Sequence, residues 1–302
     1  MADYRLIYVT GMKPKPPVRP HRELLLRVLD AALTRHDPAL AGRLQQQPDI
    51  FTLVSWTSLL YDQQRAIERD LPGVERLLAE PEPSAVDRKE IDRSGRRLAR
   101  YWHLLGDSYP SLTRIVANPA LRATLAEVRR YLEDREGIGS RIRALLTEPL
   151  KAAWQSGSPV MLIGHSLGSV LAYDALWELS RREGHPGRVS LFLSLGSPIA
   201  TRFIRVGLCG ADLSGGQRYP SNIERWVNVS ARGELVALHP RIGPFFRPMR
   251  RLGLTAAIED YSIYNHFHGD DGLDVHKSYG YLNHPLVAGV VARWLRECSN
   301  GS

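Results

Sequence analysis

The residues Gly164-His165-Ser166-Leu167-Gly168 fit the pattern G-x-S-x-G, in which a serine stands between two spaced glycines. The apolar run 160–163 precedes this motif, and the apolar run 170–173 follows it. This order predicts a strand that turns sharply into a helix and exposes the Ser166 hydroxyl on the turn. The helix N-terminus would favour a developing oxyanion there. The motif indicates nucleophilic attack by Ser166 on an acyl carbonyl; the alternative is an ordinary serine in a glycine-rich turn.

A serine hydroxyl is a weak nucleophile at neutral pH, so it needs a histidine as base and a carboxylate that orients the histidine. In this kind of strand-turn-helix site the residues follow in the order serine, acid, histidine. Glu234 lies in a loop beyond a strand predicted over 223–229, and catalytic groups gather beyond strand ends in open α/β sheets. Asp212 and Asp260 lie far from any predicted strand end. Glu234 is therefore the predicted acid.

The base must be one of the histidines that follow Glu234, which are His239, His266, His268, His276 and His284. His276 lies in a loop a few residues before the predicted terminal helix, which would bring it to the same edge as Ser166. His284 directly precedes Pro285 and is better explained as a residue at a helix N-terminus. We expect His276 to be the base, with His284 and His268 as the alternatives.

An oxyanion hole requires two backbone N–H donors near the nucleophile. The first is predicted at Leu167, the residue after Ser166. The second is predicted at Met12, in a loop after an early strand, because Gly11 allows close approach of the backbone and Pro14 has no N–H. The alternative is that this turn only stiffens the exit of the strand.

The sequence His266-Phe267-His268-Gly269-Asp270-Asp271 supports a competing hypothesis of metal-dependent hydrolysis. Two histidines at i and i+2, followed by acids, approach the H-x-H-x-D-H pattern of metallo-β-lactamase-like hydrolases. The last position is Asp271 instead of histidine, and few further ligands follow. We therefore expect no bound metal and no cofactor.

The elements around these residues predict an α/β fold with a mostly parallel sheet. Runs that are apolar throughout indicate strands covered by helices on both faces. Strands are expected at 5–11, 50–56, 159–164, 189–195 and 223–229, and helices at 21–35, 167–181 and 285–296. Amphipathic helical stretches without a convincing strand fill 57–150, which is too long for a simple connection. This segment is predicted to be a helical insertion in a single domain spanning 1–302.

Length and composition are those of a globular protein, with 302 residues, 43% hydrophobic and 24% charged. The net charge of +8 invites a nucleic-acid partner, but the arginines are scattered along the chain, so we expect none. The stretch 93–102, rich in arginine, is interpreted as a solvated helix face. Cys209 and Cys298 cannot build a disulfide framework and show no zinc-site spacing. With no signal peptide or membrane-spanning run, the expected location is the cytoplasm.

These motifs together resemble the α/β-hydrolase superfamily, and more narrowly its serine lipase and esterase branch, including bacterial lipase-related hydrolases. The resemblance covers the loop at 7–12, the G-H-S-L-G motif, the turn Leu195-Gly196-Ser197-Pro198, the acid loop and His276-Lys277-Ser278-Tyr279. It implies a Ser166–His276–Glu234 triad and a cap formed by the insertion. The chain departs from the family at the oxyanion loop, where Thr10-Gly11 replaces a common His-Gly, and in using Glu instead of Asp.

The expected function is therefore hydrolysis of a carboxylic ester, small or lipid-like, through an acyl-enzyme intermediate. Phe245 and Phe246 are candidates for an acyl pocket, although adjacent aromatic residues more often belong to a core. One alternative is a thioesterase that acts on coenzyme A or on an acidic carrier protein, which the positive charge would attract. Another is a non-catalytic protein that uses the basic helical insertion to bind an anionic partner or a membrane surface.

Overall fold

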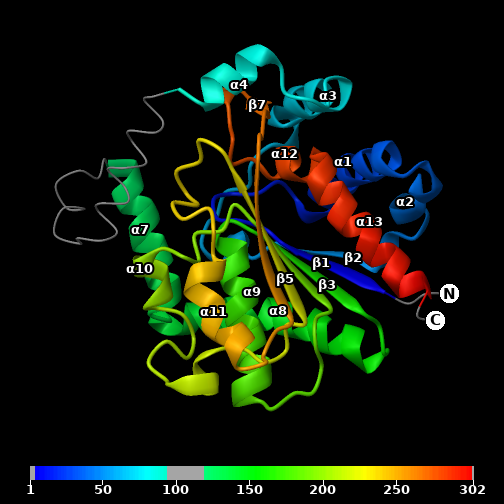
Figure 1. Ribbon diagram of the computed structural model, residues 1–302. Coiled ribbons are helices and arrows are strands. Elements are labelled where there is room, and N and C mark those ends of the chain that lie inside the picture. Colours follow the sequence, from blue (N-terminus) through cyan, green and yellow to red (C-terminus); the bar gives the residue numbers. More distant parts are fainter. Residues whose placement is uncertain (1–3, 94–118, 301–302) are drawn as a thin grey trace.

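Six strands form one sheet in the computed structural model, which describes residues 4–93 and 119–300 (Figure 1). They are β1 (Arg5–Val9), β2 (Phe51–Val54), β3 (Val160–His165), β4 (Leu191–Leu195), β5 (Arg225–Ala231) and β6 (Ala257–Ile263). Their order is β2-β1-β3-β4-β5-β6, and all neighbours pair in parallel. The predicted α/β class with a mostly parallel sheet is confirmed.

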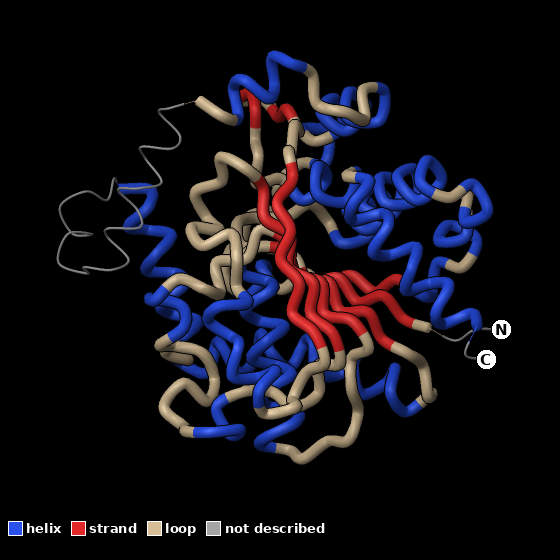
Figure 2. Tube along the Cα trace, in the orientation of Figure 1, coloured by secondary structure: helices blue, strands red, loops and turns tan. Residues whose placement is uncertain are grey.

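Helices cover both faces of this sheet (Figure 2). One face carries α1 (Val18–His36), α12 (Ser278–Asn283) and α13 (Pro285–Asn300), with α2 (Arg43–Gln46) packed on α1. The other face carries α8 (Ile138–Gln155), α9 (Leu167–Trp177) and α11 (Gly243–Arg251), with α7 (Pro119–Leu132) packed on α8. A π-helical turn, Glu178–Arg182, extends α9.

The strands divide their side chains between two hydrophobic cores because successive residues point to opposite faces. Leu6 and Tyr8 of β1 belong to the core under α1 and α13, whereas Ile7 and Val9 belong to the core under α8 and α9. Every residue of α9 is buried, as expected for a helix that is apolar on all sides. The helix that begins just after Ser166 is therefore held rigidly on both sides.

Several regular elements were not predicted from the sequence, among them strand β6 and helix α11. Strand β6 contains Glu259, Asp260 and Ser262 and lies at the edge of the sheet, where half-exposed side chains give no apolar run. Helix α11 contains Pro244 and Pro248, and prolines in a sequence usually indicate a turn or loop instead of a helix. Both elements follow the loop that carries Glu234. The predicted sheet therefore lacks its edge strand, β6.

The described parts of the predicted insertion, 57–93 and 119–150, contain helices and no strand. Helices α3 (Leu71–Ala79) and α4 (Ala85–Ile91) lie near a small hairpin formed by β7 (His268–Gly269) and β8 (Gly272–Leu273) (Figure 1). Helix α8 instead belongs to the layer on the sheet. Of the arginine-rich stretch 93–102, all but Arg93 lies outside the described residues. No helix in the described ranges has the length and hydropathy needed to cross a membrane.

Candidate active site

Ser166 occupies a strained turn between β3 and α9. Its backbone lies at φ 55° and ψ −131°. Residues other than glycine rarely adopt this conformation, and such strained residues cluster at functional sites. The Ser166 N–H donates to the carbonyl of Leu195 at 2.8 Å, which anchors the turn to β4. A Cβ at Gly168 would come 2.5 Å from the carbonyl oxygen of Val9. The close approach of α9 to β1 therefore requires glycine there.

The turn lies at the point where the strand order of the sheet reverses. Strand β1 is paired with β2 on one side and with β3 on the other, and ligands of open α/β sheets bind beyond the strand ends at such a point. The loop after β1 reaches the turn directly, since a Cβ at Gly11 would come 2.8 Å from the Cβ of Ser166. The predicted nucleophile and the predicted oxyanion loop thus lie side by side.

Glu234 and His276 form a hydrogen-bonded pair between Oε1 and Nδ1, although 42 residues separate them in the chain. Glu234 is 1% exposed, and its Oε2 accepts from the Tyr281 hydroxyl at 2.5 Å and from the Ala231 N–H at 3.2 Å. A carboxylate acceptor at Nδ1 fixes the proton there and leaves the lone pair on Nε2. This is the tautomer that a general base requires. The side chain of His276 is 25% exposed, so a substrate can approach it.

Gly196 makes room for this pair. Its φ is 57°, and a Cβ there would come 2.8 Å from Glu234 Oε1, 2.9 Å from the Tyr281 hydroxyl and 3.0 Å from His276 Nδ1. The turn after β4 was noted in the sequence, but its contact with the acid and the base was not predicted. Tyr281 was not predicted, because nothing in the local sequence indicates that its hydroxyl binds a distant carboxylate.

His165 directly precedes the predicted nucleophile Ser166 and contacts the predicted base His276. Its Nε2 lies 2.8 Å from the carbonyl oxygen of His276, and the two imidazole centroids are 4.8 Å apart. A carbonyl can only accept, so Nε2 carries the proton; burial holds the pKa of His165 well below its usual value and keeps the ring neutral. In the described part of the chain no hydrogen bond joins Ser166 to His276, and such bonds often tighten only in the substrate complex.

The two predicted oxyanion donors lie on either side of Ser166. Leu167 is the first residue of α9, where a helix leaves its N–H without an internal partner. Met12 follows Gly11, and its carbonyl oxygen accepts from Nζ of Lys15 at 2.8 Å. Burial lowers the pKa of Lys15 to about 7. Lys15 was not predicted from the sequence, and it fixes the orientation of the peptide group that follows Met12.

The segment after His276 is tied to the part of the chain that precedes α3. Asp70 is 2% exposed and binds Nζ of Lys277 at 2.7 Å, the guanidinium of Arg65 at 2.8 Å and the hydroxyl of Tyr279 at 3.2 Å. Since Lys277 is adjacent to His276, this cluster restricts the backbone of the base. This cluster leaves no recognisable pattern in the sequence. Lys277 and Tyr279 lie more than 200 residues from Asp70, and the spacing of Arg65 and Asp70 is not that of a helical ion pair.

The other candidate acids and bases are engaged elsewhere. Asp260 lies within β6 and accepts from the N–H groups of Ile242 at 2.8 Å and Gly243 at 2.9 Å, at the start of α11. Asp212 lies exposed in a loop after α10 (Arg202–Arg205). The Nδ1 of His284 accepts from the N–H of Leu286 at 3.1 Å, in agreement with its expected place at a helix start.

The histidines of the competing metal hypothesis bind protein groups. The Nε2 of His266 is 2.9 Å from the carbonyl oxygen of Glu80, and the Nε2 of His268 is 2.8 Å from Asp87 Oδ1. Within 4–93 and 119–300, no three His, Cys, Asp or Glu side chains gather as a metal site. The suggested acyl-pocket residues are also placed differently: Phe246 is buried in the core, and Phe245 lies under the guanidinium of Arg205.

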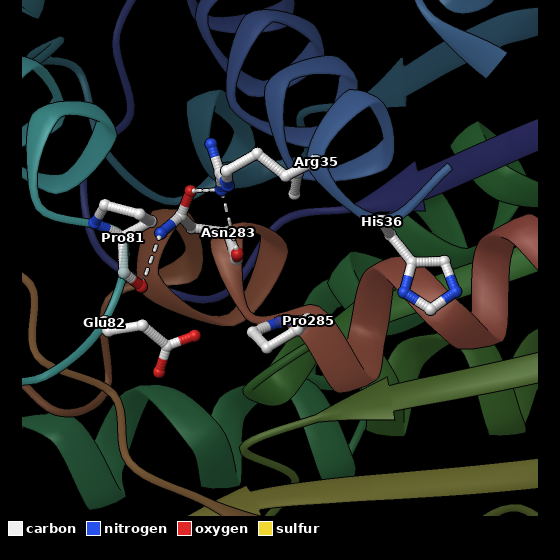
Figure 3. Close-up of a pocket in the computed structure, with 7 residues that line it drawn as sticks. Arg35, His36, Pro81, Glu82, Asn283 and Pro285 are labelled. Atoms are coloured by element: carbon white, nitrogen blue, oxygen red, sulfur yellow. Dashed lines mark hydrogen bonds between the residues drawn. The ribbon is translucent and has the colours of Figure 1, made fainter. Parts of the chain in front are cut away.

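A cavity of about 260 Å³ lies away from these groups, between the end of α1 and the junction of α12 with α13 (Figure 3). Arg35 donates to the side chain and the carbonyl oxygen of Asn283 there, while Glu82 and His36 complete its polar lining. None of the candidate catalytic side chains lines this cavity. We assign it no role in the chemistry.

Comparison with known proteins finds no matching family model, curated protein or solved structure. The roles of Ser166, His276 and Glu234 must therefore be argued from their geometry. A serine on a strained turn, a histidine with its Nε2 available and a buried carboxylate on Nδ1 are the groups that nucleophilic acyl transfer requires.

Proposed function

We propose that this protein is a serine hydrolase of the α/β-hydrolase type that cleaves carboxylic esters, with Ser166 as nucleophile, His276 as base and Glu234 as orienting acid. The observation that carries the proposal is the hydrogen-bonded Glu234–His276 pair, whose imidazole lies against the residue that precedes Ser166. Three loops distant in sequence supply these groups to one edge of the sheet. An ordinary glycine-rich turn would not need this arrangement.

The reaction begins with attack of Ser166 Oγ on the acyl carbonyl while His276 Nε2 accepts the hydroxyl proton. The N–H groups of Leu167 and Met12 would hold the oxyanion that forms. When the tetrahedral intermediate collapses, the C–O bond to the alcohol breaks and His276 returns the proton to the leaving oxygen. His276 then takes a proton from water, which attacks the acyl-serine; when this second intermediate collapses, the C–O bond to Ser166 Oγ breaks, His276 returns the proton to that oxygen, and the carboxylic acid is released. Glu234 stays ionised and stabilises the imidazolium.

Thioesters of coenzyme A or of an acidic carrier protein are the alternative substrates, since the same groups would cleave them. The proposal includes a cytoplasmic location. The segment 57–93 contacts the loop of the base through Asp70 and Lys277, which supports a role for it in covering the substrate. The length of the preferred acyl chain would then depend on this segment.

The proposal is tested by hydrolysis of p-nitrophenyl esters from acetyl to palmitoyl, together with labelling by a fluorophosphonate probe. We expect turnover of at least one ester and covalent labelling at Ser166, located by mass spectrometry of the labelled peptide. Acyl thioesters in the same assay distinguish the alternative substrate class. Labelling at another serine, or none with no turnover of any ester or thioester, would contradict the proposal and favour a binding protein.

Replacement of His165 should reduce turnover because this residue holds the backbone of the base. His165→Phe keeps a planar ring but leaves the carbonyl of His276 without its donor, which should lower kcat about tenfold with little change in KM. His165→Gln retains an N–H and should lose less. Steady-state kinetics of both variants, with circular dichroism as a check of folding, test this. Wild-type kcat in the Phe variant would show that the hydrogen bond is irrelevant to turnover.

A further inference from the structure

One stretch of the chain carries positive charge without any acid. Between Glu234 and Glu259 there is no Asp or Glu, while Arg241, Arg247, Arg250 and Arg251 all fall in this interval. All four arginines are exposed. Within the described ranges none of them forms an ion pair, whereas the exposed arginines of other helices do, as in the pairs Arg19–Glu23, Arg27–Glu75, Arg76–Glu80 and Arg129–Glu133.

Helix α11 carries Arg247, Arg250 and Arg251 on its exposed side, because its apolar side packs in the core. Phe246 and Met249 are 2% and 0% exposed and pack in the core under the sheet, where Phe246 contacts Tyr173 and Trp226. Asp260, on the neighbouring strand β6, is engaged by backbone N–H groups at the start of the helix. Arg250 and Arg251 suit the negative end of the helix dipole, but Arg241 and Arg247 lie outside that last turn.

Two exposed apolar side chains lie in the segments next to these arginines. Leu252, directly after the last two arginines, is 49% exposed, and Val206, at the end of α10, is 67% exposed. Helices α10 and α11 touch, since the guanidinium of Arg205 lies 4.6 Å from the ring centroid of Phe245. Cations mixed with protruding apolar groups suit the headgroup region of a lipid bilayer. A nucleic acid would instead be bound by cations with polar or stacking side chains.

We propose that the surface formed by Arg241, Arg247, Arg250, Arg251, Val206 and Leu252, here called the basic face, binds an anionic lipid membrane. The arginines contact phosphate-bearing headgroups, and the two apolar side chains enter the boundary between headgroups and acyl chains. A fluid lipid surface requires no fixed pattern of partner charges, which fits arginines that lie at irregular spacing. This proposal does not depend on the proposed hydrolase activity.

The test is sedimentation of the full chain with vesicles of phosphatidylcholine alone or mixed with phosphatidylglycerol. We expect binding only to the mixed vesicles, decreasing with added salt. The triple variant Arg247→Gln, Arg250→Gln, Arg251→Gln should bind about a hundredfold more weakly, from the usual contribution of an arginine near an anionic surface. Leu252→Ser combined with Val206→Ser should weaken binding further without changing the salt dependence.

A matched control is Arg129→Gln, Arg130→Gln, Arg135→Gln, which removes the same net charge from arginines that pair with Glu133 and Glu136. This variant should bind nearly as well as the wild-type chain, and circular dichroism should show that both triple variants are folded.

Equal loss of vesicle binding in the two triple variants would show that net charge alone attracts the chain and would overturn the proposal. Stronger binding of a DNA duplex or an acidic protein than of mixed vesicles, lost in the first variant, would also overturn it. The Ser166→Ala chain should bind vesicles normally, which separates this result from the fate of the hydrolase proposal.

Discussion

Ser166→Ala is expected to lower kcat for ester hydrolysis by about 10⁴- to 10⁶-fold, the usual loss when the nucleophile of a serine hydrolase is removed. No other group could form the acyl-enzyme, so only the oxyanion donors and substrate binding would act in the variant. The measurement is turnover of the best p-nitrophenyl ester, with fluorophosphonate labelling lost in parallel. Substrate affinity should change little, because alanine leaves the walls of the site in place.

Ser169→Ala provides the control for this result. Ser169 lies in the first turn of α9, three residues after Ser166. Its hydroxyl donates to the carbonyl of Ser166 and lies 2.6 Å from the hydroxyl of Ser197. Its replacement therefore removes a nearby buried hydroxyl that is not the predicted nucleophile. We expect this variant to retain most of the activity. If Ser166→Ala kept more than a tenth of wild-type turnover, the assignment of the nucleophile would be wrong.

Glu234→Gln is expected to lower kcat by about 10²- to 10⁴-fold with KM nearly unchanged. The amide has no charge to stabilise the imidazolium that forms when His276 takes the proton, and its NH₂ group can favour the wrong tautomer. Because Glu234 is buried and bound by Tyr281 and Ala231, the amide would remain in place and the effect would be electrostatic. Steady-state kinetics across neutral pH measure it.

Two further variants separate charge from structure. Tyr281→Phe removes one donor to the carboxylate and leaves its charge, so we expect a loss of about tenfold or less. Asp260→Asn should lower the thermal midpoint of unfolding without a comparable loss of kcat, because Asp260 caps α11. A Glu234→Gln chain with full activity, or an Asp260→Asn chain without any, would move the role of the acid away from Glu234.

The local pattern of the sequence was enough to place the strand-turn-helix around Ser166. Residues 160–163 are apolar throughout, the two glycines permit close packing, and α9 follows at once, so the prediction and the structure agree within two residues at the start of each element. The same reasoning placed Glu234 beyond the end of a strand and His276 before the terminal helices. These predictions depend on hydrophobic periodicity and glycine positions, which act over a few residues.

Strand β6 and helix α11 could not be recognised in this way. An edge strand carries polar residues on a half-exposed surface, and a helix with two prolines looks like a loop. Both form because the tertiary structure supplies partners: β5 offers a free edge with full pairing, and Asp260 satisfies the first N–H groups of the helix. These contacts outweigh the low intrinsic strand propensity of β6 and the low helix propensity of α11.

The sequence by itself determined which residues could take part in a reaction and the edge of the sheet at which each would lie. Only the tertiary structure decided which of them meet: the bond between Glu234 and His276, the support from Tyr281 and Gly196, and the contact of His165 with the base. The reason is physical. Local periodicity specifies the direction of a strand and the position of a turn, whereas contacts between loops depend on strand order and on packing across the whole sheet.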